Sequence, residues 1–192
     1  MDYPVLSKSP DTAQAIVPHA IDANGNAVPQ SSSAPGPVAA PVNARATQTP
    51  AVTASSAYVA GNAVGGLLTF GNLVRANGLG GIVQSVVLKD KAAQNVSYDL
   101  FLFDAAPTAP TDKTAVALAA ADLAKCIGVV PLAGAAFGAA STMGVITAAG
   151  IGLAYKITTV YAASLYGILV TRGTPTYAST SDVSVDLVAL PD

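Results

Sequence analysis

The sequence predicts an all-β protein: a two-sheet sandwich or jelly-roll-like body with one short helix, preceded by an extended, proline-rich N-terminal arm. Eight of the 13 prolines fall in the first 50 of the 192 residues. After that point, short apolar runs are separated by turns rich in Gly, Pro, Asn and Asp, a pattern typical of all-β folds. We therefore divide the chain into an arm over residues 1–50 and a β-sandwich body over residues 51–192.

The arm combines a low-complexity segment with a candidate hairpin. Residues 28–41 are rich in Pro, Ser and Ala, which predicts an extended chain with no core of its own. Upstream, the turn-forming pair Asn24-Gly25 between two short apolar runs predicts a small hairpin over residues 15–29. A lone hairpin is marginally stable in water, so we expect the arm to order by docking on a neighbour. The candidate partner-contact residues are Ile16, Val17, Ile21, Val28, Pro35, Pro37 and Pro41.

The body contains about nine strand-like runs. They cover residues 52–59, 67–74, 81–89, 96–103, 127–132, 144–147, 152–160, 164–171 and 183–190. In the last of these, Val183, Val185 and Leu187 alternate with Ser184, Asp186 and Val188, so the two sets occupy opposite faces of a strand. Nine short strands favour a sandwich or jelly roll and leave the strand order open.

One segment of the body has the composition of a helix. Residues 112–125 are rich in Ala and Leu, with an aspartate at the start and a lysine at the end. Alanine and leucine have high helix propensity, and these charges complement the helix dipole. We expect a short helix or helical turns packed on one edge of the sandwich.

Charge is scarce and scattered along this chain. Charged residues make up 10% of it, against the usual ~25%, and the nine basic residues form no stripe that could neutralise phosphates. Nucleic-acid binding is therefore not expected. A weakly charged surface favours self-association or assembly onto a larger surface.

Compartment and membrane signals point to synthesis in a reducing cytoplasm. The single cysteine, Cys126, cannot form an internal disulfide, and the N-terminus lacks the basic and apolar regions of a signal peptide. Residues 126–155 carry no charge, so a membrane helix is the alternative to buried strands. Frequent Gly and Ala, together with Pro131, favour strands. We expect no membrane partner.

The residues that could do catalysis are few. The chain has one histidine, His19, one cysteine, no glutamate and no tryptophan. Cys126 is a possible nucleophile, but its apolar flank favours a structural thiol. Residues Asp90, Asp99, Asp104, Asp112 and Asp122 are candidates for a carboxylate pair, against the alternative of solvated turn residues. The motif Asp22-x-Asn24-x-Asn26 resembles the start of a calcium loop but has Ala27 at the required glycine. We expect no catalytic residue, metal or cofactor, and no enzyme activity.

The body resembles β-rich virion proteins of tailed bacteriophages of the capsid decoration, cement or head-fibre type. The passages that carry the resemblance are YVAGNAVGG (58–66), IVQSVVLKD (82–90), YDLFLFD (98–104) and LYGILVTRGTPTYAST (165–180). The resemblance covers roughly residues 50–190 and includes no catalytic signature. It implies a homo-oligomeric β domain, a dimer or a trimer, on the outer surface of an icosahedral capsid, with the major capsid protein as its partner.

Both approaches lead to the same expectation. The chain is expected to be a non-enzymatic virion protein that binds and stabilises the outer capsid shell, made in the host cytoplasm, with residues 1–50 as a clamp. The alternative is a tail- or fibre-associated module that binds a receptor or carbohydrate through loops at one end of the sandwich.

Overall fold

The computed structural model describes residues 43–74, 80–134, 143–157 and 164–191, and the backbone of residues 19–21 and 27–29. The chain divides into two compact units, residues 1–40 and 41–192. In the first unit, β1 (His19–Ile21) and β2 (Ala27–Pro29) pair antiparallel, with Ala20 opposite Val28. Both strands lie within the hairpin predicted over residues 15–29, of which residues 15–18 and 22–26 lie outside the described residues.

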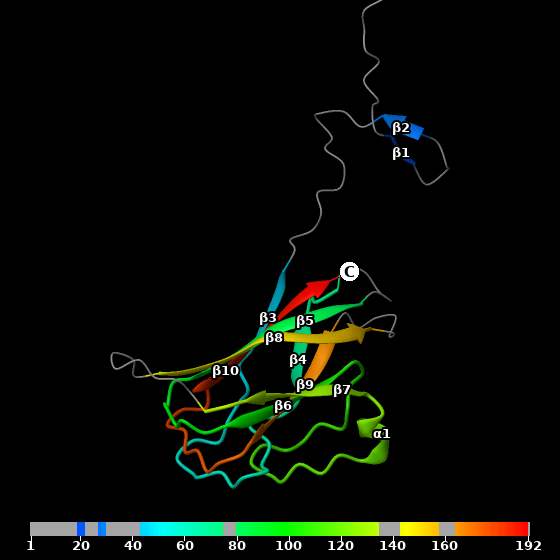
Figure 1. Ribbon diagram of the computed structural model, residues 1–192. Helices are drawn as coiled ribbons and strands as arrows, with labels where there is room; N and C mark the ends of the chain where they lie inside the picture. Colours follow the sequence, from blue (N-terminus) through cyan, green and yellow to red (C-terminus); the bar gives the residue numbers. More distant parts are fainter. Residues whose placement is uncertain are drawn as a thin grey trace, which may run out of the picture. The chain divides into compact units, whose positions relative to one another are not determined.

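In the described residues of the second unit, eight strands form two four-stranded antiparallel sheets (Figure 1). One sheet has the order β3-β10-β5-β8 and the other β4-β9-β6-β7. The strands are β3 (Ala44–Gln48), β4 (Leu68–Gly71), β5 (Gly80–Asp90), β6 (Tyr98–Phe103), β7 (Cys126–Leu132), β8 (Gly144–Lys156), β9 (Ser164–Thr171) and β10 (Val183–Pro191). The short helix α1 (Ala120–Leu123) precedes β7. The predicted all-β sandwich with one short helix is confirmed.

The strand order is that of a jelly roll. The first four strands of the body pair in reverse order with the last four: β3 with β10, β4 with β9, β5 with β8, and β6 with β7. The body is therefore one long antiparallel hairpin. Two further pairings, β10 with β5 and β6 with β9, fold this hairpin over into two sheets. An eight-stranded, two-sheet barrel of this kind is a jelly roll.

The core lies between the two sheets, where alternate residues of each strand point inward. Leu100 and Leu102 of β6 and Leu165 and Leu169 of β9 meet residues of the other sheet in one cluster that is almost completely buried. The other sheet contributes Val83, Val86, Leu88, Val183, Val185, Leu187 and Ala189. Each large aliphatic side chain that is fully buried stabilises the fold by roughly 1.5–3 kcal/mol relative to exposure. The apolar residues that alternate with period two in the sequences of β6 and β10 are the ones that point into this core.

Two boundaries differ from the sequence prediction. Strand β3, residues 44–48, falls within the residues assigned to the arm, yet it is an edge strand of the body and pairs with β10. Residues 144–147 and 152–160, predicted as two strands, form the single strand β8 as far as Lys156. The strand is continuous but contains a bulge. Gly150 and Gly152 take positive φ values of 67° and 68° at the point where its register with β5 shifts.

Two other predicted elements also differ in the structure. Residues 52–59 make only an isolated bridge, between Ala54 and Tyr177, although the Ser55 amide donates to Tyr177. Ser55 takes a positive φ of 57°, which interrupts the extended backbone of a strand. The helix covers only residues 120–123 of the predicted 112–125. Backbone bonds between Ala63 and Thr114 and between Gly61 and Val116 hold the preceding residues extended, so tertiary pairing overrides their helix propensity.

Candidate interaction surfaces

The outer face of sheet β3-β10-β5-β8 carries an ion network centred on Asp186. This aspartate of β10 is fully buried. It accepts hydrogen bonds from Arg45 and, at 2.6 Å, from the Thr47 hydroxyl, and Lys89 Nζ lies 2.7 Å away. Burial by itself raises the pKa of Asp186, but the hydrogen bonds from Lys89, Thr47 and Arg45 outweigh it and lower that pKa to about 2. The aspartate is therefore ionised at neutral pH.

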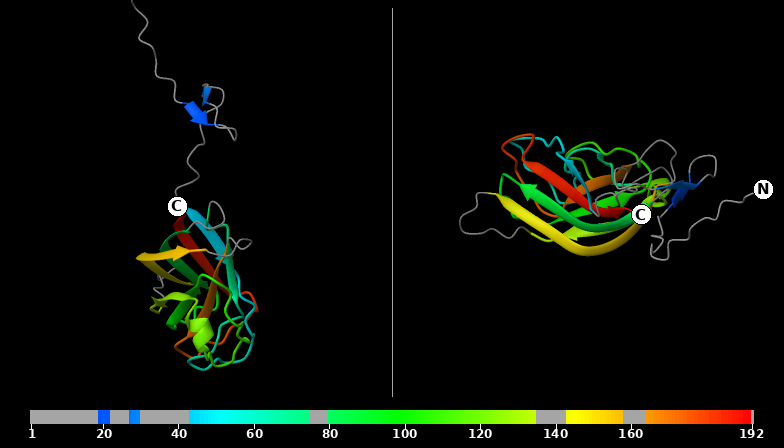
Figure 2. Two further views of the ribbon diagram at one scale, coloured as in Figure 1. Left: turned by 90° about the vertical axis from the view of Figure 1, so that its right-hand side faces the viewer. Right: turned by 90° about the horizontal axis from the view of Figure 1, so that it is seen from above.

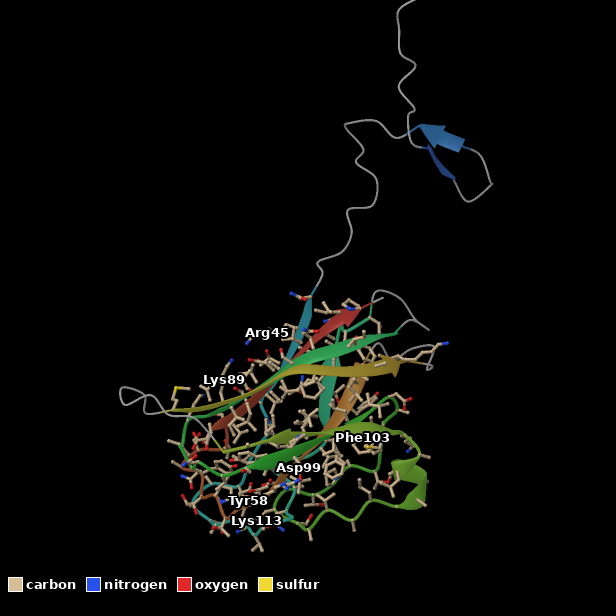
Figure 3. The ribbon with its side chains drawn as sticks, in the orientation of Figure 1. Arg45, Tyr58, Lys89, Asp99, Phe103 and Lys113 are labelled. Atoms are coloured by element: carbon tan, nitrogen blue, oxygen red, sulfur yellow. The ribbon has the colours of Figure 1, made fainter. Side chains whose placement is uncertain are left out.

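The network joins three neighbouring strands. Asp186 stands opposite Thr47 of β3 and opposite Val87 of β5, and Lys89 reaches it from two residues along β5. Figure 3 shows Arg45 and Lys89 on this sheet. Their side chains stay partly exposed, so the carboxylate is enclosed while its cations face solvent. This arrangement ties the sheet together, and both of its cations are already paired.

The outer face of the other sheet is covered by the chain itself. Phe103, Ile168 and Val170 point away from the main core and are nevertheless buried. The connection from β6 to β7, residues 104–125, lies over them and adds Val116 and Leu118 to a second small core. Figure 3 labels Phe103 on this side. This cover removes most of the apolar outer face from solvent.

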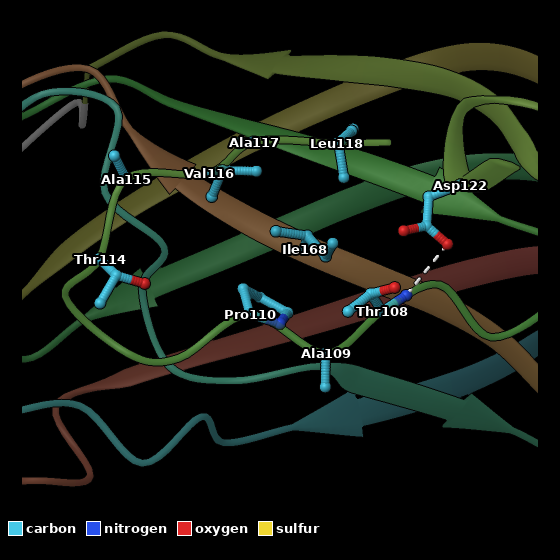
Figure 4. Close-up of a pocket in the computed structure, with 10 residues that line it drawn as sticks. All are labelled: Thr108, Ala109, Pro110, Thr114, Ala115, Val116, Ala117, Leu118, Asp122 and Ile168. Carbon is cyan, nitrogen blue, oxygen red and sulfur yellow. Dashed lines mark hydrogen bonds between the residues drawn. The ribbon is translucent and has the colours of Figure 1, made fainter. Parts of the chain in front are cut away.

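A pocket of about 200 Å³ lies beneath that connection (Figure 4). Residues 114–118 line one side and residues 108–110 the other, Ile168 of β9 lies between them, and Asp122 lies at one end. The Asp122 carboxylate accepts from the Thr108 amide at 3.1 Å and from Lys125 Nζ at 3.0 Å, which lowers its pKa. Small-molecule sites usually have volumes of roughly 300–1,000 Å³. The pocket is smaller than this, and its acidic group already has partners.

The connection between β3 and β4 is held by Asp112 at one end of the sandwich. Its carboxylate accepts from the Thr53 amide and hydroxyl, the Tyr58 hydroxyl at 2.8 Å and the Gly65 amide at 2.6 Å. Burial opposes ionisation, but these hydrogen bonds leave the pKa of Asp112 below its ordinary value. One side chain thus organises residues 53–65, including Tyr58, which Figure 3 labels at this end.

Tyr58, which donates to Asp112, is the first of three tyrosines in contact with one another. The rings of Tyr58 and Tyr177 meet edge to face at 5.3 Å, and the hydroxyls of Tyr98 and Tyr177 lie 3.0 Å apart. Burial, together with the Asp112 carboxylate, raises the pKa of Tyr58 to about 12. Burial also raises the pKa values of Tyr98 and Tyr177. All three hydroxyls are therefore neutral and support the core.

The turn aspartates are held more tightly than the sequence suggested. Asp90 and Asp122 are buried rather than solvated. Asp90 accepts from the amides of Ala92 and Gln94, and burial is the main reason that its pKa is raised. Asp99 forms a two-pronged ion pair with Arg172 at 2.6 and 2.7 Å. Asp90, Asp99, Asp112 and Asp122 therefore serve in turns and ion pairs, each with its own partners, and the backbone amide of Asp104 donates to Lys125.

The remaining sequence candidates are scattered. Cys126 starts β7, is half-buried, and donates weakly to the Gly128 carbonyl at 3.6 Å. Within the described ranges, no three His, Cys, Asp or Glu side chains come together as a metal site. In those same ranges, no helix is long and apolar enough to span a membrane.

The predicted arm contacts are placed only in part. Ile21 lies in β1, where it pairs with Ala27, and Val28 lies in β2. Ile16, Val17, Pro35, Pro37 and Pro41 lie outside the described residues. Their role in partner binding stays a prediction.

Sequence reasoning anticipated the face of Asp186 but none of its partners. The alternation in residues 183–188 predicts an outward-facing aspartate, whereas its bonds to Arg45 and Lys89 depend on the strand order. No protein-family model, curated protein or solved structure matches this chain significantly. The assignment of a function therefore rests on the geometry described above.

Proposed function

We propose that this protein is a non-enzymatic structural component of a virion, of the decoration or cement type found on tailed-bacteriophage capsids. In this role the jelly roll sits on the outer shell and self-associates, and the proline-rich arm reaches a neighbouring subunit. The observation that carries the proposal is the jelly-roll strand order, an architecture common in viral capsid proteins and lectins. The sequence resemblance to phage virion proteins points the same way.

The distribution of charge supports an assembly protein. Several cations of the body are engaged within the fold: Arg45 and Lys89 with Asp186, Lys125 with Asp122, and Arg172 with Asp99. These four cations already have a carboxylate partner within the fold, although their side chains stay partly exposed, so they offer little unpaired charge to a charged ligand. Contacts to a shell would then be apolar and hydrogen-bonded, and such contacts are less sensitive to salt than exposed ion pairs.

The physical mechanism is multivalent stabilisation. A protein that binds only the assembled shell stabilises it by mass action. Linking the body to an arm makes the second contact intramolecular, so two weak contacts give a much stronger attachment. A proline-rich arm also loses less conformational entropy on docking than a flexible one.

Co-sedimentation with shells tests the proposal. The full-length chain is mixed with assembled shells of the shell protein encoded in the same genome, alongside a truncated form that lacks residues 1–40. The first compact unit ends at residue 40, so this truncation leaves all strands of the body intact. Full-length protein is expected to pellet with shells at a fixed ratio, and the truncated form to bind much more weakly.

The carbohydrate-binding alternative predicts a different result. Jelly rolls also occur in lectins, so the full-length protein should be applied to a glycan array in parallel. A shell protein is expected to show no sugar preference. Failure to pellet with shells, combined with selective glycan binding, would replace the proposal with a receptor-binding module.

A further inference from the structure

The uncharged stretch of the sequence forms one side of the sandwich. No charged residue occurs between Lys125 and Lys156. This stretch supplies β7 and all of β8 except its last residue, Lys156, and the two strands are an edge of each sheet. The two edges are adjacent, because a Cβ placed on Gly128 of β7 would lie 3.0 Å from the Leu153 side chain of β8. In Figure 2, right-hand view, β8 is the curved yellow strand along one border of the body. This charge-free side includes exposed Val129 and Val145.

Edge strands invite pairing with another chain unless they are short, charged, bulged or interrupted by proline. Three edges of the body have such protection. Strand β4 has 4 residues, β3 has 5 and carries Arg45, and β7 contains Pro131, which has no amide hydrogen to donate. Strand β8 is the exception, with 13 residues. Its bulge at Gly150 and Gly152 disrupts only the second half.

The first half of β8 is therefore an open edge. From Gly144 to Ala149 it pairs in regular register with β5, and no other strand in the described part of the chain pairs with its opposite side. Alternate backbone N–H and C=O groups of an edge strand point away from the sheet. The outward side chains Val145, Thr147 and Ala149 are exposed and uncharged.

We propose that the edge formed by residues 144–149 pairs antiparallel with the same edge of a second copy of this chain, to form a two-fold dimer with one continuous eight-stranded sheet. Identical strands that pair antiparallel about a two-fold axis satisfy each other's donors and acceptors, so the surface is self-complementary. Burying an unpaired charge in an interface is costly. Residues 144–149 are uncharged, so two copies of this edge can meet without burying a charge. Because stable interfaces bury roughly 800 Å² per partner, the flanking apolar side chains are part of the contact.

This inference deepens the proposed function and rests on the self-association within it. The test compares three valine-to-lysine variants of the full chain by light scattering after size exclusion, over a range of concentrations. Val145→Lys and Val129→Lys add a charge at valines 41% and 45% exposed, and Val145 stands opposite Lys89 of β5. Val59→Lys is the matched control, at a valine 63% exposed in the connection between β3 and β4.

The wild type and Val59→Lys are expected to be dimers. Val145→Lys is expected to raise the dimer dissociation constant about 100-fold, because it brings two like charges together near the axis, and Val129→Lys to raise it less. Far-ultraviolet circular dichroism confirms that each variant is folded. If a variant fails this check, hydrogen exchange of the wild type decides: amides of residues 144–149 should become more protected as concentration rises.

The outcomes separate the two proposals. A wild type that stays monomeric overturns both this inference and the self-association in the proposed function, whatever the result of shell co-sedimentation. A wild-type oligomer that Val145→Lys leaves intact, or whose residues 144–149 exchange at the same rate at all concentrations, overturns only the assignment of this edge.

Discussion

Lys89 Nζ lies 2.7 Å from the carboxylate of Asp186, across the boundary between β5 and β10. Arg45 and Thr47 approach the same carboxylate from β3 on the other side. A single aspartate thus connects the first strand of the body to the last, and the last to β5. Because Asp186 is buried and its cations are partly exposed, the pairing is more than a surface salt bridge, yet it remains accessible to solvent ions.

Replacing Asp186 with asparagine should destabilise the body. The change keeps the shape of the side chain but removes the charge that Arg45 and Lys89 neutralise, at a cost of about 1–3 kcal/mol in the free energy of unfolding. Urea denaturation at pH 7 measures this loss. Asp99→Asn, at the more exposed pair with Arg172, is the control and should cost less than about 1 kcal/mol.

Asp186 should also make the free energy of unfolding depend on pH in the acidic range. Its pKa is lowered to about 2 from an ordinary value of 3.8, so its ionised form is favoured in the folded state. The resulting stabilisation is fully present above about pH 4 and is lost as pH falls through about 2. Its size is at most about 2 kcal/mol, and solvent screening of Arg45 and Lys89 reduces it towards about 1 kcal/mol.

Thermal unfolding between pH 5 and pH 2 measures this dependence. The difference in the free energy of unfolding between wild type and Asp186→Asn should narrow over that range, since at pH 2 about half of the folded wild type is protonated at Asp186 and most of the charge-dependent stabilisation is lost. A constant gap would show that shape and packing, rather than charge, explain the effect of the substitution.

Two truncations should locate the start of the body. Removing residues 1–40 deletes only the first unit and should leave the melting temperature of the body nearly unchanged. Removing residues 1–50 also deletes β3, with Arg45 and Thr47, and uncovers one side of β10. We expect that form to melt at least about 10 °C lower. Equal melting temperatures would mean that β3 contributes little.

Gly167 should not tolerate even one extra carbon. A Cβ there would lie 2.9 Å from the Phe70 ring and 3.1 Å from Leu100, so Gly167→Ala overpacks the core and should cost about 1–3 kcal/mol. Gly71→Ala is the matched control in the partner strand, where the nearest atom is the Ser164 hydroxyl oxygen at 3.7 Å. That change should stay within about 0.5 kcal/mol. Chemical denaturation of both variants provides the comparison.

Asp112→Asn should loosen one end of the sandwich. The substitution weakens charge-assisted bonds from Thr53, Tyr58 and Gly65, at a cost of about 1–3 kcal/mol. Hydrogen exchange should accelerate most at the Thr53 and Gly65 amides. Uniform acceleration across all strands would instead indicate a global loss of stability.

The sequence identified the elements whose own pattern is strong. Strands β6 and β10 alternate apolar and polar residues with period two, and the paired glycine and asparagine residues mark turns, so the fold class could be predicted from local signals. Strand β3 could not be found this way. Its sequence, Ala-Arg-Ala-Thr-Gln, has only one buried residue, and its pairing with β10 decides its conformation.

The candidate surfaces depend still more on topology. Asp186 could be placed on an outer face from its neighbours, but Arg45 is 141 positions away in the sequence. The uncharged segment from residue 126 to residue 155 was visible in the sequence, yet only the strand order reveals that it forms two adjacent edges. The predicted helix does not form over residues 112–119 for the same reason, because the backbone of this segment bonds to residues 61–63 instead of within a helix.

The position of β10 has a consequence for how this protein is made. Although β10 is the last strand of the body in sequence, it lies inside its sheet, between β3 and β5. Strands β3 and β5 therefore have no common partner until the ribosome has released residues 183–191. Before that moment their facing edges are unpaired, and a nascent chain in this condition is prone to associate wrongly. Completion of the fold, and with it competence for assembly, waits for the end of translation of the body.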